Sequence, residues 1–78
     1  MIKLNSKQLE ALVKLAVSDE PVDYIEFLPD LKPVHDLIGY GFVSEINGFY
    51  KIRKKGRNYY NKFLEHASKF FEGKRDSN

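Results

Sequence analysis

The pattern of apolar and polar positions divides the chain into helical segments and one hairpin. In the first segment, apolar residues recur at the i, i+3, i+4, i+7 and i+8 spacing of one buried helix face. These residues are Leu9, Leu12, Val13, Ala16 and Val17. Asn5 and Gln8 have capping-box spacing, which predicts that the helix begins near Asn5. We expect it to end at residues 18–21.

A short second helix is predicted directly after this point. Asp23 and Glu26 again have capping-box spacing and would open it. Leu28 precedes Pro29, which disfavours the α conformation at Leu28. This helix is therefore predicted to end at Leu28, after about one and a half turns of ~3.6 residues each.

A third helix is predicted after a turn of only a few residues, which is helix-turn-helix spacing. Asp30 can cap it, Pro33 is tolerated in its first turn, and Gly41 has the C′ position that ends many helices. Its apolar stripe comprises Leu31, Val34, Leu37 and Ile38. The exposed face is predicted to comprise Lys32, His35, Asp36 and Gly39.

Asn47 and Gly48 predict a two-residue hairpin turn, because both tolerate the positive φ that a type I′ turn needs. This turn fixes a register in which Ile46 lies opposite Phe49 and Phe42 lies opposite Arg53. Alternation along the strands then divides the side chains between two faces. Val43, Tyr50 and Ile52 are predicted to face the core, and Ile46, Phe49, Lys51 and Arg53 to lie on the other face.

A long helix over about residues 55–72 follows the hairpin. Its apolar stripe comprises Tyr60, Phe63, Leu64, Ala67, Phe70 and Phe71. Gly73 is predicted to end it. The sequence thus predicts a mostly α chain with a small β-hairpin (α+β), in which residues 1–73 form one domain and residues 74–78 a disordered tail.

Composition narrows the function classes. The 78 residues include no cysteine, which excludes disulfides and thiolate metal sites. No apolar run approaches the roughly 18 residues of a membrane span, so we expect a cytoplasmic protein without membrane contact. His35 and His66 lie on different predicted helices, and no glycine-rich phosphate loop or nucleophile motif is present. We therefore expect neither an enzyme nor a cofactor.

Charge is distributed unevenly along the chain. Residues 19–46 carry seven acidic residues and one lysine, a net charge of −6, whereas residues 47–78 carry nine basic and three acidic residues, a net charge of +6. A basic segment attracts phosphate, but an acidic segment repels it wherever the two lie close. Charge alone therefore leaves both nucleic acid and basic proteins as candidate partners.

The element order, together with two strings, resembles the winged helix-turn-helix family of transcription regulators over about residues 6–66. LKPVHDLIGYGFV looks like the end of a recognition helix entering the first wing strand. FYKIRKKGRNYY looks like the second wing strand running into the next helix, with a Lys-Gly-Arg signature. The resemblance implies three helices, a two-stranded wing, a long C-terminal helix, and a regulator that binds double-stranded DNA.

The resemblance also implies where DNA contacts would lie. Lys32 and His35 fall at base-reading positions of the recognition helix. A basic set at the base of the wing would hold phosphates, and it comprises Lys51, Arg53, Lys54, Lys55 and Arg57. Both sets also fit an ordinary solvated surface.

A protein-interaction module on the same fold is the alternative, for example a phage or mobile-element protein that binds a host factor. Its contacts would be the acidic surface of the second and third helices, or Ile46 and Phe49. Another segment could instead cover this apolar pair. The last helix carries more aromatic surface than a small core readily covers, which indicates either a homodimer through Tyr59, Phe63, Phe70 and Phe71 or a longer core helix.

Overall fold

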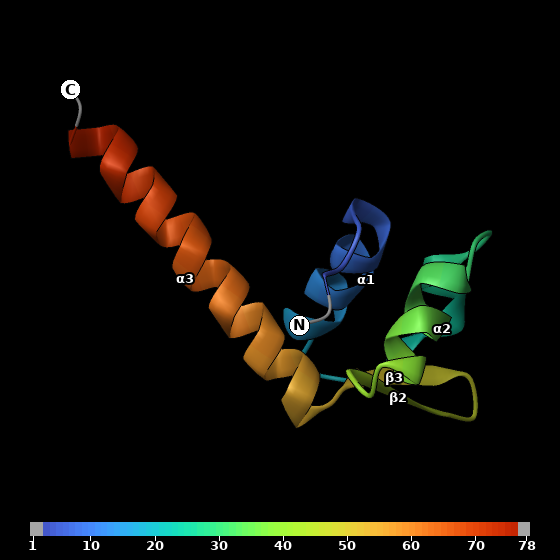
Figure 1. Ribbon diagram of the computed structural model, residues 1–78. Coiled ribbons are helices and arrows are strands. Elements are labelled where there is room, and N and C mark those ends of the chain that lie inside the picture. The colour runs from blue at the N-terminus through green and yellow to red at the C-terminus, as the bar shows by residue number, and fades with distance from the viewer. Residues whose placement is uncertain (1–2, 77–78) are drawn as a thin grey trace.

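The computed structural model describes the backbone of residues 3–76 and the side chains of residues 3–67. Its elements are α1 (Ser6–Ala16), β1 (Val22–Asp23), the 3₁₀-helix η1 (Tyr24–Phe27), α2 (Lys32–Gly39), β2 (Val43–Ile46), β3 (Phe49–Ile52) and α3 (Lys54–Asp76) (Figure 1). The described part of the chain is therefore α+β, with three α-helices and one antiparallel sheet, and the predicted fold class is confirmed at this level.

The sheet has three strands in the order β1-β3-β2, one strand more than predicted. The hairpin register is confirmed, from Ile46 opposite Phe49 to Val43 opposite Ile52. The turn residues Asn47 and Gly48 have φ of 53° and 82°, as a type I′ turn requires. Strand β1 pairs with β3 through only two residues. Alternation of apolar and polar residues cannot reveal a strand this short.

The predicted start of α1 is confirmed, but the prediction of its buried face is partly wrong. The Gln8 amide N–H donates to Asn5 Oδ1 over 2.8 Å, and Gln8 Oε1 accepts from the Asn5 N–H over 3.0 Å. The buried residues are Gln8, Ala11, Leu12, Leu15 and Ala16. Val17, predicted on this face, is 66 % exposed. The stripe is rotated because α1 packs against α2, α3 and β3, and because a glutamine occupies one of its core positions.

The short helix and the end of α2 follow the predicted local signals, whereas the N-cap residue of α2 is Leu31, without a side-chain cap, rather than the predicted Asp30. The Asp23 side chain accepts from the Ile25 N–H over 3.1 Å, although η1 is a single 3₁₀ turn rather than an α-helix. The Asp30 side chain accepts from the Lys32 N–H over 3.0 Å. Gly41 has φ 83° and ends α2 as predicted. Its N–H donates to the Ile38 carbonyl and the next N–H to the Leu37 carbonyl, which is a Schellman motif.

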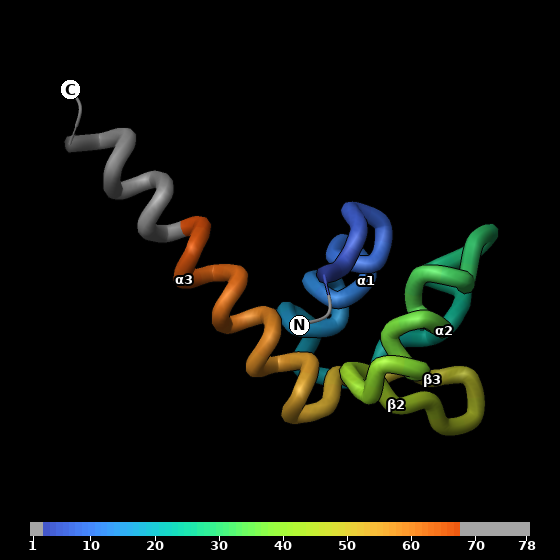
Figure 2. The backbone as a smooth tube through the Cα atoms, in the orientation of Figure 1, coloured from blue at the N-terminus to red at the C-terminus, as the bar shows by residue number. Residues whose placement is uncertain are grey.

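The core lies between α1, α2 and the inner face of the sheet. Its largest fully buried side chains are Leu12, Leu15, Val34, Leu37 and Val43. Tyr50 is 2 % exposed on the predicted core face of β3. Phe42, which leads into β2, is also buried at 3 % exposure. Figure 2 shows the hairpin lying against α2, with α3 starting where β3 ends.

Helix α3 spans Lys54–Asp76, so the predicted end at Gly73 is wrong. A glycine inside a helix costs about 1 kcal/mol relative to alanine, but it keeps both backbone hydrogen-bonding groups and does not end a helix by itself. Three residues of the predicted tail, 74–76, belong to α3, and residues 77–78 lie outside the described part. Across the described residues, no helix combines the length and apolarity needed to cross a membrane.

Candidate nucleic-acid interface

The predicted base-reading lysine on α2 has a partner within the same helix. Lys32 Nζ lies 3.3 Å from Asp36 Oδ1, an i,i+4 ion pair on the surface. Asp36 Oδ2 also accepts from Gln8 Nε2 over 3.0 Å. This Gln8 hydrogen bond lowers the pKa of Asp36, the hydrogen bond and charge of Lys32 lower it further, and partial desolvation opposes them. The α2 surface therefore carries an ionised aspartate beside its only lysine.

His35 is held against the sheet. Its Nε2 lies 3.1 Å from the Tyr50 hydroxyl, and the two rings meet edge to face at 6.2 Å between centroids. Burial raises the pKa of Tyr50, with a smaller contribution from the charge of Glu45, so its hydroxyl stays protonated and able to donate. His35 thus has an intrachain partner at the position where the family resemblance implies contact with a base.

The two predicted basic sets do not form one surface. Successive side chains of a strand point to opposite faces of the sheet. Tyr50 points into the core and toward His35 of α2, so Lys51 points to the face away from α2. Lys32 and Lys51 would therefore meet a flat ligand from different sides of the domain.

Two cations of the Lys-Gly-Arg string bind the ends of other helices. Lys55 Nζ donates to the Tyr40 carbonyl at the C-terminus of α2 over 2.9 Å, and it lies 5.4 Å from the centroid of the Phe42 ring. Arg57 Nη1 donates to the carbonyl of Ala16, the last residue of α1, over 3.4 Å. Free carbonyls and the dipole make helix C-termini favourable sites for cations. Sequence reasoning missed these roles because the partners are 15 and 41 residues away.

The glycine of the same string allows a close approach of two backbone segments. Gly56 is buried in the first turn of α3, and a Cβ there would clash with the Phe42 carbonyl oxygen. That oxygen already accepts from the Arg53 N–H over 2.8 Å, which closes the base of the hairpin. Gly56 thus lets α3 start directly against the entry to β2.

All five cations of the basic set are exposed, but Lys55 and Arg57 are held by carbonyls of other elements, which leaves Lys51, Arg53 and Lys54. The ion pairs found among residues 3–67 involve none of them. With Arg57 they line a hollow of about 410 Å³ between the end of α1 and the start of α3. Asp19 and Glu20 line the same hollow and reduce its positive potential.

The apolar pair at the hairpin tip is exposed. Ile46 is 70 % exposed and Phe49 is 46 % exposed, so neither α3 nor the N-terminal segment covers them. Tyr24 lies beside them, because its N–H donates to the Gly48 carbonyl over 2.8 Å and its ring lies over Gly48. Ile25, the next residue, is 58 % exposed. Four exposed apolar side chains therefore lie at or next to the tip in the sequence and the sheet, and we call them the tip patch: Tyr24, Ile25, Ile46 and Phe49.

The aromatic residues predicted as a dimer interface on α3 have different surroundings. Tyr59 packs inside the chain: its hydroxyl accepts from the Leu4 N–H over 3.2 Å, and its ring centroid lies 5.3 Å from that of Phe42. Phe63 is 37 % exposed. The side chains of Phe70 and Phe71 lie outside the described residues. Dimerisation through α3 stays a prediction.

Comparisons with protein-family models, with curated proteins and with solved structures each found no match.

Proposed function

We propose that the chain is a small winged helix-turn-helix protein that binds double-stranded DNA, in the role of a transcriptional regulator. The order of the elements supports this: a helix, a short strand, two helical segments joined by a short turn, and a hairpin. The short strand β1 adds to the hairpin and anchors it to the helical part. In this proposal the hairpin is the wing, its root holds phosphates, and α2 is the helix that lies in or near the major groove. Because Lys51 and α2 lie on different sides of the sheet, one duplex would have to contact the domain at the edge between these two sides.

The observation that carries the proposal is the exposed cluster of Lys51, Arg53 and Lys54 at the root of the hairpin. Lys51 belongs to β3, Arg53 lies between β3 and α3, and Lys54 is the first residue of α3. Lysine and arginine at such a position bind the DNA backbone by releasing condensed counterions. Because Lys55 and Arg57 bind carbonyls within the chain, we assign phosphate contact to the other three cations.

The same geometry argues for weak base discrimination. Sequence is read mainly by side chains that reach base edges. On α2, Lys32 is beside Asp36 and His35 is beside Tyr50, so few free donors face outward. We therefore propose binding that is dominated by phosphate contacts and varies little with base sequence.

Fluorescence anisotropy with a labelled duplex tests this proposal. With three phosphate contacts, affinity should fall roughly 40-fold between about 50 and 200 mM salt. Lys51→Glu combined with Lys54→Glu should abolish most of the binding. The control pair Lys3→Glu and Lys7→Glu makes the same change in net charge near the start of α1 and should have a much smaller effect. No binding at about 50 mM salt, or equal losses in both pairs, would contradict the proposal.

The exposed tip patch favours a second candidate function, which is capture of a protein segment. Apolar side chains at this exposure beside polar neighbours are common anchors of interfaces. Asp23 lies next to Phe49 in the sheet, and Glu26, which is ion-paired with Lys14 over 3.6 Å, follows Ile25. Lys51 lies on the same strand face as Ile46 and Phe49, whereas Glu45 lies on the opposite face with Tyr50. The acidic residues on the β1 and η1 side of the patch favour a partner that presents lysine or arginine on that side of its apolar residues.

Two synthetic helical peptides with the same leucine stripe, one with lysines and one with glutamates on its polar face, provide a defined probe. We expect the lysine peptide alone to bind, and Ile46→Ser with Phe49→Ser to remove that binding. Val17→Ser is the matched control, since Val17 is 66 % exposed on a different element. Equal binding of both peptides, or full binding by the double variant, would rule out this function for the patch.

A further inference from the structure

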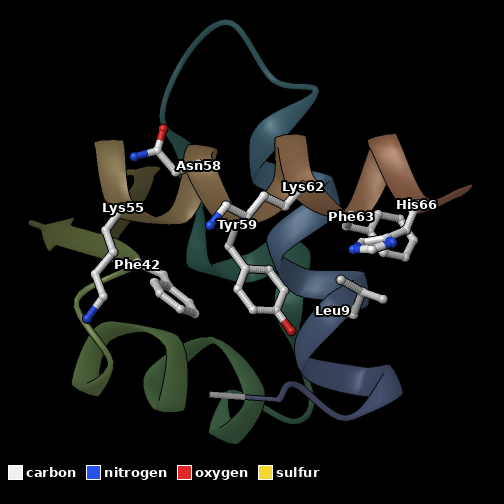
Figure 3. Close-up of a pocket in the computed structure, with 8 residues that line it drawn as sticks. All are labelled: Leu9, Phe42, Lys55, Asn58, Tyr59, Lys62, Phe63 and His66. Atoms are coloured by element: carbon white, nitrogen blue, oxygen red, sulfur yellow. The ribbon is translucent and has the colours of Figure 1, made fainter. Parts of the chain in front are cut away.

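A groove runs between α3 and the body of the domain (Figure 3). Its volume is about 730 Å³, within the range of roughly 300–1,000 Å³ of small-molecule sites. Its apolar lining comes from three parts of the chain: Leu9 from α1, Phe42 from the segment before β2, and Tyr59 and Phe63 from α3. Figure 3 shows the Phe42 and Tyr59 rings side by side in the groove, with Leu9 and Phe63 toward its other end.

Part of this groove is built before any ligand arrives. The Tyr59 hydroxyl accepts from the Leu4 N–H, and its ring packs against Phe42. Lys55 closes one end, where its ammonium group binds the Tyr40 carbonyl and lies over the Phe42 ring. These contacts already fix two aromatic side chains of the groove floor. Ligand binding would therefore cost little conformational entropy for ordering them.

The polar side chains of the groove come from one face of α3, and its two lysines carry the same charge. Lys55, Lys62 and His66 lie at i, i+7 and i+11 on one face of α3, and the described lining includes no carboxylate. The two ion pairs found among residues 3–67 leave Lys62 unused. Asn58 adds an amide to the same side. The groove therefore combines an apolar floor with a row of donors, which is the complement of an apolar molecule with an anionic head.

We propose that this groove binds a lipophilic monoanion, such as a medium-chain fatty carboxylate. The chain or ring of the ligand would lie on Phe42, Tyr59 and Phe63, and its carboxylate would receive a charge-assisted hydrogen bond from Lys62. This proposal is independent of DNA binding, because none of Lys51, Arg53 and Lys54 lines the groove.

Sodium dodecanoate, kept below its micellar concentration, is a suitable probe. An NMR titration should show saturable one-to-one shifts of the signals of Leu9, Phe42 and Phe63, while dodecan-1-ol should bind at least fivefold more weakly. Lys62→Glu replaces an exposed side chain and should weaken dodecanoate at least fivefold. Lys7→Glu, an equal charge change on the exposed surface of α1, should leave the affinity unchanged.

Three results would overturn the proposal. Equal affinity for dodecanoate and dodecan-1-ol would show that the cations of the groove do not contribute to binding. A leucine–glutamate helical peptide that binds the groove more tightly than dodecanoate would assign it to an acidic protein segment. Shifts of the same signals with protein concentration alone would assign it to a second copy of the chain.

Discussion

Gly56→Ala should destabilise the domain by about 1–3 kcal/mol, which is the usual cost of forcing an extra carbon into a packed region. The added Cβ would clash with the Phe42 carbonyl oxygen and lie 3.0 Å from the Ile52 Cγ1 atom. A backbone carbonyl cannot rotate aside, and this one also accepts the Arg53 N–H that closes the hairpin. Urea unfolding followed by circular dichroism would measure the loss.

Gly39→Ala is the matched control for this prediction. Gly39 ends α2, is exposed, and has open space where a Cβ would stand. Removal of a helical glycine there should leave stability unchanged or raise it by up to about 1 kcal/mol. Equal effects of the two substitutions would mean that α3 does not start against the Phe42 carbonyl.

Leu15→Ala should cost about 2–5 kcal/mol, as expected for a leucine truncated in a packed core. Leu15 is 2 % exposed and belongs to the main core cluster. A domain of this size has a total stability of only about 4–12 kcal/mol, so the variant should melt far below the parent. Thermal unfolding by circular dichroism would show the shift.

Val17→Ala provides the comparison, because the sequence pattern places Val17 on the buried face while the structure leaves it 66 % exposed. We expect a change within about 0.5 kcal/mol, as is usual for surface substitutions. If Val17→Ala were as damaging as Leu15→Ala, the face of α1 that packs on the core would be the one that the apolar spacing predicts.

Local signals predict the parts of this fold that depend on neighbouring residues. The Asn5–Gln8 capping box, the Gly41 end of α2 and the Asn47–Gly48 register all form within a few residues of sequence. The parts that sequence reasoning missed depend on distant segments. Strand β1 exists because β3 offers an edge, and Gln8 is buried because Asp36 accepts its amide across 28 residues.

The candidate sites show the same division. The basic set at the hairpin root is visible in the sequence, and so is the apolar pair Ile46 and Phe49. Which cations stay free is not visible, because this depends on where the carbonyls of Tyr40 and Ala16 lie in space. The groove beside α3 could not be predicted either, since its lining comes from residues between 9 and 66.

The segment from Lys51 to Arg57 therefore divides two tasks among adjacent positions. Lys55 and Arg57 hold α3 against the ends of the other helices, and Gly56 lets it start against the entry to β2. The side chains of Lys51, Arg53 and Lys54 take part in neither of the ion pairs described among residues 3–67. Selection can change the charge of the second group without loosening the domain. A related chain could thus gain or lose affinity for polyanions through single substitutions at this root while its fold stayed the same.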